Sequence, residues 1–248
     1  MASPRATGRQ QPSRQQPSPL SDAGAIARYK RAAARAAAEI VGDGMRVGLG
    51  TGSTVACLLP ALAERELRGL TCVATSPATA RAARQLGLAV HELDDVGELD
   101  LAIDGADQVD PRGWLIKGGG AAHTREKIVA AAARRFVVIV SAEKTVPRLG
   151  PPVPLELIRF GVQSTLRALG PAKLRARGSG LQGSPDGGLI ADYLGAVGDP
   201  AELATRLSAT PGVVEHGLFA PGMVSLILIG GEQGVERRAG AKPEAAAG

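Results

Sequence analysis

The chain has 248 residues, 44% of them hydrophobic, which is enough for a real core in one large domain or two small ones. Aromatic residues make up only 2%, so Ala, Leu, Val and Ile must fill the interior. The formal net charge is +5, but residues 1–20 hold Arg5, Arg9 and Arg14 and no acidic residue, which leaves +2 for the rest. With few rings to stack on bases and no basic run in the body, the composition argues against a nucleic-acid partner.

Residues 1–20 are rich in Gln, Pro and Arg, and we expect them to form a disordered tail. They lack the apolar stretch of a secretory signal, and no apolar run in the chain approaches the length of a membrane span. Cys57 and Cys72, the only two cysteines, both lie in apolar contexts, which is typical of buried free thiols in a reducing compartment. The sequence therefore predicts a cytoplasmic protein without a membrane partner.

The first part of the chain predicts a helix over about 22–41, capped by Ser21 or Asp22, then a strand at 46–49 and a helix from 53 to about 65. Between the last two lies Gly-Thr-Gly-Ser-Thr at 50–54, whose N–H groups and hydroxyls at a helix N-terminus suit a phosphate or a sugar. Ser53 stands where a dinucleotide fingerprint needs glycine, and no Lys-Ser/Thr pair follows as in a P-loop. Nucleotide binding is therefore disfavoured.

Further strands are predicted at 71–75, 88–92, 99–104 and 136–140, with helices at 77–86 and about 122–135. These strands lack the alternation of a half-exposed sheet, which favours a parallel sheet covered by helices on both faces. Ligands of such sheets bind at the carboxyl ends of the strands. Residues 50–54, residues 104–107 and Lys144 all fall at such ends, so we expect a single site there.

Four prolines between 147 and 154 indicate a change of domain. Beyond them the pattern is strand (155–160), helix (162–169), strand (173–177), strand (189–193), helix (200–208) and strand (213–217), the ferredoxin-like βαββαβ order. The predicted class is α/β: a Rossmann-like, mostly parallel sheet with helices on both faces, plus a smaller α+β ferredoxin-like domain. We assign residues 21–150 and 218–232 to the first domain, 151–217 to the second, and 233–248 to a frayed tail.

Candidate catalytic side chains gather between residues 99 and 127. Asp-Gly-Ala-Asp at 104–107 ends a strand, Lys117 leads into three glycines, and Glu126 lies in the first turns of a helix. Taken singly, each side chain is explained by a turn cap or a solvated surface. Three carboxylates and one ammonium among glycines that let a ligand approach are instead suited to moving protons at a small polar substrate.

No metal site is predicted, because the histidines at 91, 123 and 216 are scattered and the cysteines have no histidine at ligand spacing. His123 stands beside the glycines and could touch a substrate, but we interpret it as a solvent-exposed histidine.

Asp-Gly-Ala-Asp at 104–107 and Lys-Gly-Gly-Gly-Ala-Ala-x-Thr-Arg-Glu-Lys at 117–127 together resemble the ribose-5-phosphate isomerases of the A type. Thr-Gly-Ser-Thr at 51–54 also matches that family, and the resemblance covers roughly residues 22–232. It implies interconversion of D-ribose 5-phosphate and D-ribulose 5-phosphate through a cis-enediolate, in the non-oxidative branch of the pentose phosphate pathway. It also implies a homo-oligomer, dimer or tetramer, that binds a phosphosugar and needs no cofactor or metal.

The resemblance implies roles for the candidate residues. Glu126 is the expected base. Lys117, with the glycine N–H groups, is expected to stabilise the enediolate oxygen. Asp104 and Asp107 are expected to act in ring opening and in the transfer of hydroxyl protons. Substrate contacts are expected from Thr51, Gly52, Ser53, Thr54, Gly105, Ala106, Gly118, Gly119, Gly120 and Lys144. Three segments depart from the family pattern: Gln108 stands for a usual Glu, residues 184–188 replace a Thr-Asp-Asn-Gly-Asn hairpin, and residues 75–79 lack a Ser-rich form.

Two alternatives stay open. A non-catalytic sugar-phosphate sensor could use a related sheet, although such regulators usually carry a DNA-binding helical domain, which the residues before the first helix are too few to form. Another sugar-phosphate isomerase, such as an amino-sugar phosphate deaminase, is disfavoured by Lys-Gly-Gly-Gly. An assay with ribose 5-phosphate, with and without a chelator, separates these possibilities.

Overall fold

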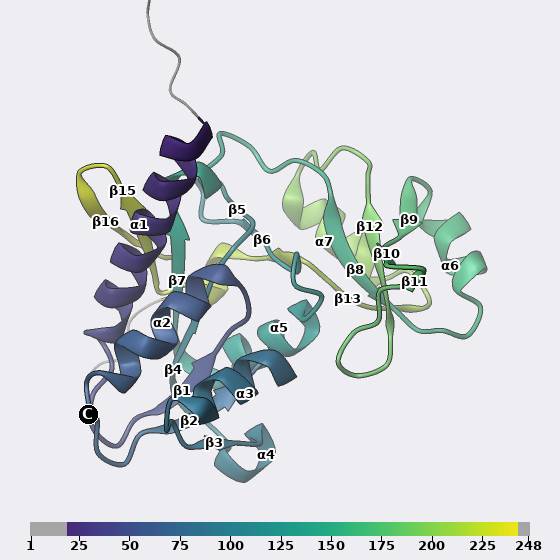
Figure 1. Cartoon of the computed structure of the whole chain (residues 1–248). Helices are drawn as coiled ribbons and strands as arrows, with labels where there is room; N and C mark the ends of the chain where they lie inside the picture. The colour runs from purple at the N-terminus through teal and green to yellow at the C-terminus, as the bar shows by residue number, and fades with distance from the viewer. Residues whose placement is uncertain (1–18, 243–248) are drawn as a thin grey trace, which may run out of the picture.

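The computed structural model describes residues 19–242, and its centre is a seven-stranded sheet in the order β16-β15-β7-β4-β1-β2-β3 (Figure 1). Its strands are β1 (Arg46–Leu49), β2 (Thr71–Ala74), β3 (Val90–His91), β4 (Leu99–Asp104), β7 (Ala133–Ser141), β15 (Leu226–Gly231) and β16 (Gly234–Ala239). Neighbours pair in parallel except β15 with β16. The central strands are buried on both faces, which explains their continuous apolar runs.

Helices cover both faces of this sheet. On one face α1 (Pro19–Ala38), α2 (Ser53–Ala63) and α3 (Pro77–Gln85) pack over a core that includes Ala37, Leu58 and Ile103. On the other face α4 (Leu93–Val96) and α5 (His123–Ala132) pack over a core that includes Val129 and Phe136. The predicted α/β class with a mostly parallel sheet is confirmed.

A second, four-stranded sheet has the order β13-β8-β12-β9 with every neighbour antiparallel. Its elements are β8 (Val153–Leu157), α6 (Val162–Leu169), β9 (Ala172–Leu174), β12 (Leu189–Tyr193), α7 (Pro200–Ser208) and β13 (Val213–His216). Numbered along the chain, the strands follow the order 4-1-3-2 of the ferredoxin-like unit. A hairpin of β10 (Ala176–Arg177) and β11 (Gly180–Leu181) projects from it.

A small three-stranded sheet joins the two larger ones. It consists of β5 (Gln108–Val109), β6 (Leu115–Ile116) and β14 (Leu218–Phe219), and two short 3₁₀ helices, η1 (Ala142–Lys144) and η2 (Pro221–Met223), complete the fold. Leu115 and Phe219 belong to the core under α5, whereas Ile116 and Leu218 belong to the core of the four-stranded sheet. Alternate residues of this connection therefore serve two cores.

The predicted bounds of the first helix, and its cap at Ser21 or Asp22, are wrong. The helix begins at Pro19, a residue type that is favoured in a first helical turn, so residues 19 and 20 do not belong to a disordered tail. It ends at Ala38, where the Arg65 guanidinium donates to the carbonyl oxygens of Ala38 and Val41. Residues 1–18 lie outside the described residues.

The predicted frayed tail from 233 is also wrong over 234–239, which form β16. A two-residue turn at 232–233, followed by Gly234 at φ +110°, returns the chain antiparallel to β15. Val235 then packs on the core under α1. The end of this tail, residues 243–248, lies outside the described residues.

Two smaller differences from the predicted elements concern edge strands of the two larger sheets. The strand predicted at 88–92 spans only two residues, and the acidic segment after it forms the unpredicted helix α4. The strand predicted at 173–177 is interrupted at Arg175, whose side chain donates to the Gly118 carbonyl.

Between residues 19 and 242 there is no helix with both the length and the apolar character needed to cross a membrane.

Candidate active site

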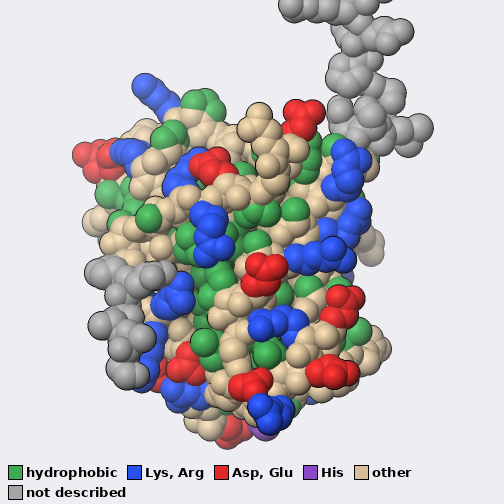
Figure 2. All heavy atoms as spheres, turned by 90° about the vertical axis from the view of Figure 1, so that its left-hand side faces the viewer, with side chains coloured by type: hydrophobic (Ala, Val, Ile, Leu, Met, Phe, Trp, Pro, Cys, Tyr) green, Lys and Arg blue, Asp and Glu red, His purple; other side chains and the backbone are tan. Residues whose placement is uncertain are grey.

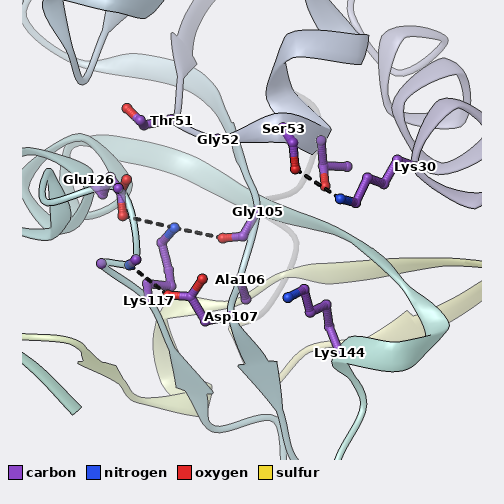
Figure 3. A pocket seen from close by; sticks show the side chains of 14 residues that line it. Lys30, Thr51, Gly52, Ser53, Gly105, Ala106, Asp107, Lys117, Glu126 and Lys144 are labelled. Atoms are coloured by element: carbon purple, nitrogen blue, oxygen red, sulfur yellow. Dashed lines mark hydrogen bonds and ion pairs between the residues drawn. The ribbon is translucent and has the colours of Figure 1, made fainter. Parts of the chain in front are cut away.

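A cavity of about 110 Å³ opens beyond the carboxyl ends of β1, β4 and β7 (Figure 3). All of the predicted site residues except Asp104 line it: Thr51, Gly52, Ser53, Thr54, Gly105, Ala106, Asp107, Lys117, Gly118, Gly119, Gly120, Glu126 and Lys144. Lys30 of α1, which the sequence placed on a helix but not in the site, also lines the cavity. Parallel strands bring these segments to one edge, as their positions after strands predicted.

Lys117 is the central group of the site. It is 2% exposed, and its Nζ lies 2.6 Å from the Gly105 carbonyl oxygen, 2.8 Å from Asp104 Oδ2 and 3.0 Å from Glu126 Oε2. Of these three oxygens, only the Gly105 carbonyl is in hydrogen-bond geometry. The two carboxylate oxygens have no hydrogen-bond partner among the described residues, so Lys117 holds them as ion pairs. Asp104 lies behind the lysine, 3% exposed and away from the cavity, where it also accepts the N–H groups of Gly105 and Thr51.

Burial changes the acidity of this group of three charges. Burial, and then repulsion from Asp104, raises the pKa of Glu126 to about 8, although its place in the first turn of α5 favours the ionised form. Burial likewise raises the pKa of Asp104, against the attraction of Lys117. Burial alone would lower the pKa of Lys117, but the two carboxylates hold it above its usual range. Lys117 therefore stays charged, and Glu126 can gain or lose a proton near neutral pH.

The glycine segment after Lys117 is tightly packed. The N–H of Gly119 donates to Asp107 Oδ2 at 2.7 Å, which holds that carboxylate at the cavity wall. Gly118 has φ +106°, and a Cβ there would lie 2.7 Å from His123 Nδ1. Both the backbone conformation and the space at this position therefore require glycine.

The interpretation of His123 as solvent-exposed is wrong, because the ring is fully buried under Gly118. Its Nε2 lies 3.4 Å from the Glu215 carbonyl oxygen, and burial lowers its pKa to about 4, so the ring is neutral. The partner is 92 residues away in sequence, and the local pattern holds no sign of it.

The opposite side of the cavity is basic. Lys30 Nζ donates to Ser53 Oγ at 3.0 Å, and Lys144 extends from η1 toward the same side (Figure 3). Residues 51–54 lead into the N-terminus of α2, where N–H groups attract an anion. The cavity thus has a carboxylate and a buried lysine at one end and two lysines with hydroxyls at the other.

The three departures from the family pattern fall outside the cavity lining. Gln108 makes two reciprocal 2.8 Å bonds with the backbone of Gly150, so its amide holds a loop. In the 75–79 segment, Thr75 bonds the Thr51 hydroxyl at 2.8 Å and Thr79 donates to the Gly50 carbonyl at 2.9 Å, which braces the 50–54 turn from behind. Ser184 donates to the buried Glu156 at 2.5 Å.

Among residues 19–242 there is no group of three or more His, Cys, Asp or Glu side chains that could hold a metal ion.

The parallel sheet has a buried carboxyl and an ammonium at one end of a polar cavity and two lysines at the other, an arrangement typical of an α/β enzyme for a small anionic substrate. Residues 71–234 match the family model of ribose 5-phosphate isomerase A (phosphoriboisomerase A). Ribose-5-phosphate isomerase A of Caulobacter vibrioides is 47% identical over 219 residues, which cover 84% of this chain and 96% of that protein.

Solved structures agree with this match. Ribose 5-phosphate isomerase A from Methanocaldococcus jannaschii superposes with a TM-score of 0.80 at 37% identity, covering 85% of this chain and 98% of that one. A D-ribose-5-phosphate isomerase in complex with phospho-erythronic acid gives a TM-score of 0.82 at 34% identity, covering 86% and 99%. The chain belongs to the ribose 5-phosphate isomerase A family, and it is an isomerase.

Proposed function

We propose that this enzyme interconverts D-ribose 5-phosphate and D-ribulose 5-phosphate through a cis-enediolate, with Glu126 as the base. The observation that carries the proposal is the buried contact of 3.0 Å between Glu126 and Lys117 at one end of a cavity whose other end is basic. An aldose–ketose exchange needs one base near two carbons and positive charge near the oxygens.

The basic end is the proposed phosphate site. Lys30, Ser53 and Lys144, with the N-terminus of α2, offer ammonium, hydroxyl and backbone N–H groups to a phosphate. A solved relative is in complex with phospho-erythronic acid, a ligand that carries a phosphate and a carboxylate, and a ligand of this chemistry suits a cavity with a basic end. With the phosphate at the basic end, the reacting carbons lie at Glu126.

Glu126 is suited to take a proton from C2 and return it to C1. One of its oxygens is held by Lys117, and the other points away from the lysine (Figure 3). Its pKa of about 8 lies near the working pH, at which a general base is most effective. The hydroxyl proton of O2 must move to O1, and Asp107, which lines the cavity, is the proposed carrier.

While Glu126 is ionised, its Oε2 is ion-paired with the Lys117 ammonium at 3.0 Å. When Glu126 takes the C2 proton it loses its negative charge at the moment the substrate oxygen gains one. The ammonium is then free to exchange the carboxyl for that oxygen, so its stabilisation acts on the enediolate. Asp104, which the sequence placed at the substrate, is proposed instead to keep Lys117 charged and in place.

That the enzyme works as a homo-oligomer in the cytoplasm stays an expectation from the family resemblance.

The direct test of function is conversion of ribose 5-phosphate by the purified protein, followed as ketose formation with and without EDTA. We expect equal turnover in both. Absence of turnover, or turnover that EDTA abolishes and a divalent ion restores, would refute the metal-free reaction.

The base is tested by exchange of the C2 proton with deuterated solvent, followed by NMR. Glu126→Gln should lower kcat and exchange on the order of 10²- to 10⁴-fold, the usual effect of a general base, with little change in KM. Glu143→Gln, an exposed glutamate beside Lys144, is the matched control and should leave both unchanged. If Glu126→Gln still exchanges at the parent rate while Asp107→Asn does not, the assigned base is wrong. A sensor without catalytic function would show no exchange in the parent.

A further inference from the structure

Arg175 reaches from the four-stranded sheet to the glycine segment of the active site. Its backbone N–H donates to Ile190 O and its carbonyl accepts the N–H of Gln182, both at 2.8 Å, so its main chain is fixed beside β12. Its Nη1 donates to the carbonyl oxygens of Gly118 at 3.0 Å and Gly119 at 3.2 Å. No part of Arg175 lines the cavity.

Asp192 of β12 fixes the guanidinium itself. The two side chains make a two-point contact of 3.0 Å (Nε to Oδ2) and 2.5 Å (Nη2 to Oδ1), and they are 21% and 19% exposed. A planar fork with both edges engaged has little freedom to rotate. The Nη1 hydrogens therefore meet the two glycine carbonyls in one orientation.

The orientation of those carbonyls sets the direction of the next N–H groups. A trans peptide is planar, so its C=O and its N–H point to opposite sides. With the carbonyls of Gly118 and Gly119 turned toward Arg175, the N–H groups of Gly119 and Gly120 point away from it. The N–H of Gly119 indeed meets Asp107, which lines the cavity, on that far side.

We propose that Arg175 is a positioning residue for the isomerisation: it turns the N–H of Gly120 toward the enediolate oxygen and, through the N–H of Gly119, holds Asp107 at the substrate hydroxyls. This inference rests on the proposed function, and it assigns part of the active-site geometry to the ferredoxin-like unit. Within the segment, the N–H of Ala121 donates to the Gly118 carbonyl at 3.0 Å. Arg175 adds a hold from outside that also reaches the Gly119 carbonyl, and glycine, which is flexible in isolation, gains alignment of its N–H groups from it. Oriented backbone N–H groups are valuable because they need no reorganisation when charge develops.

The first test compares Arg175→Met, which keeps volume but removes every donor, with Arg175→Lys, which keeps charge but not the fork. We expect Arg175→Met to lower kcat about ten- to a hundredfold, less than the 10²–10³ that deletion of an oxyanion donor costs. KM should change little, since the phosphate site lies at the other end, and Arg175→Lys should fall between. Arg46→Met, which breaks a comparable Arg–Asp pair (side chains 35% and 27% exposed) in the other sheet, is the matched control.

A second readout separates positioning from loss of folded protein. Phospho-erythronic acid carries charged oxygens on a planar carbon, as the enediolate does, whereas ribitol 5-phosphate carries phosphate and hydroxyls only. By calorimetry, Arg175→Met should weaken binding of the acid by the same factor as kcat/KM and leave the alditol unchanged. Equal weakening of both ligands, no weakening of either, or the same loss in Arg46→Met would overturn the proposal. A parent enzyme without turnover or C2 exchange would instead refute the proposed function.

Discussion

Replacing Lys117 with methionine is the sharpest test of the charge arrangement in the site. Methionine fills nearly the same volume but leaves Asp104 and Glu126, each 3% exposed, without their shared cation. Removing one partner of a buried ion pair typically costs about 3–5 kcal/mol, because the remaining charge stays buried. Here a carboxyl can avoid that cost by binding a proton, so the loss should depend on pH.

The size of the effect follows from the proton balance. In the parent, Lys117 neutralises one carboxylate, and the other, Glu126, holds a proton in the folded state up to a pKa of about 8. In Lys117→Met the second carboxyl, Asp104, must hold a proton too, whereas in the unfolded chain it gives it up near its ordinary value of 3.8. Stability from a raised pKa is complete below the unfolded value and is lost as pH rises. The deficit should therefore begin above the folded-state pKa that Asp104 has in the parent, which burial already raises. Beyond that point it should grow by about 1.4 kcal/mol per pH unit.

Urea unfolding at pH 5, 6, 7 and 8 measures this deficit. The double variant Lys117→Met/Glu126→Gln has one ionisable carboxyl fewer, so its pH dependence should return toward that of the parent while its activity stays absent. Lys144→Met, on the other side of the same cavity, should show no pH-dependent loss. A deficit of Lys117→Met that stays constant from pH 5 to pH 8 would refute the reasoning.

Three further predictions concern the same site. As the proposed base, Glu126 must be unprotonated to act, so kcat/KM should rise about tenfold per pH unit up to pH ~8 and then level off. The free energy of unfolding should fall between pH ~4.5 and ~8, since the folded protein holds a proton that the unfolded chain releases; a pH–rate profile and urea titrations check both. Ser53→Ala should raise KM more than it lowers kcat, because contacts at the proposed phosphate site act on ground and transition states alike. Steady-state kinetics in which kcat alone fell would contradict this. Gly50→Ala should lower the melting temperature strongly, because a Cβ would overlap the Asp104 carboxylate, whereas Gly24→Ala in α1, where a Cβ meets nothing within 4 Å, should not.

The position of the site was predictable because it follows from topology. Parallel strands that alternate with helices end at one edge of their sheet, so any polar segments directly after them meet there. Residues 51–54, 105–107 and Lys144 could thus be grouped without knowing a single distance. Lys117 and Glu126 join them because β6 and α5 follow in the next 20 residues of chain. Segments that are this close in sequence have few alternative positions relative to one another.

The roles of the two aspartates could not be read from their motif. Asp104 and Asp107 stand three residues apart, yet one lies buried behind Lys117 and the other lines the cavity. Their separation is decided by the bend after β4, which Lys117 fixes by bonding the Gly105 carbonyl. Lys30 was missed for a related reason: only the packing of α1 against α2 and β15 brings its side chain to Ser53, 23 residues away. A helical pattern predicts which residues share one face of the helix, but it does not predict which part of the molecule that face contacts.

The contacts that orient the site come from farther still. Arg175 meets Gly118 across 57 residues, and the buried His123 meets Glu215 across 92. Both contacts join the four-stranded unit to the segment that runs from Gly118 into α5, and neither side carries a periodic pattern that would mark it. Motifs therefore supply the chemical groups, because those groups are close in sequence. Which carboxylate is suited to act as the base depends on burial, and the direction of the glycine N–H groups depends on a polar contact between the four-stranded unit and the glycine segment. Both are decided only when the chain is folded.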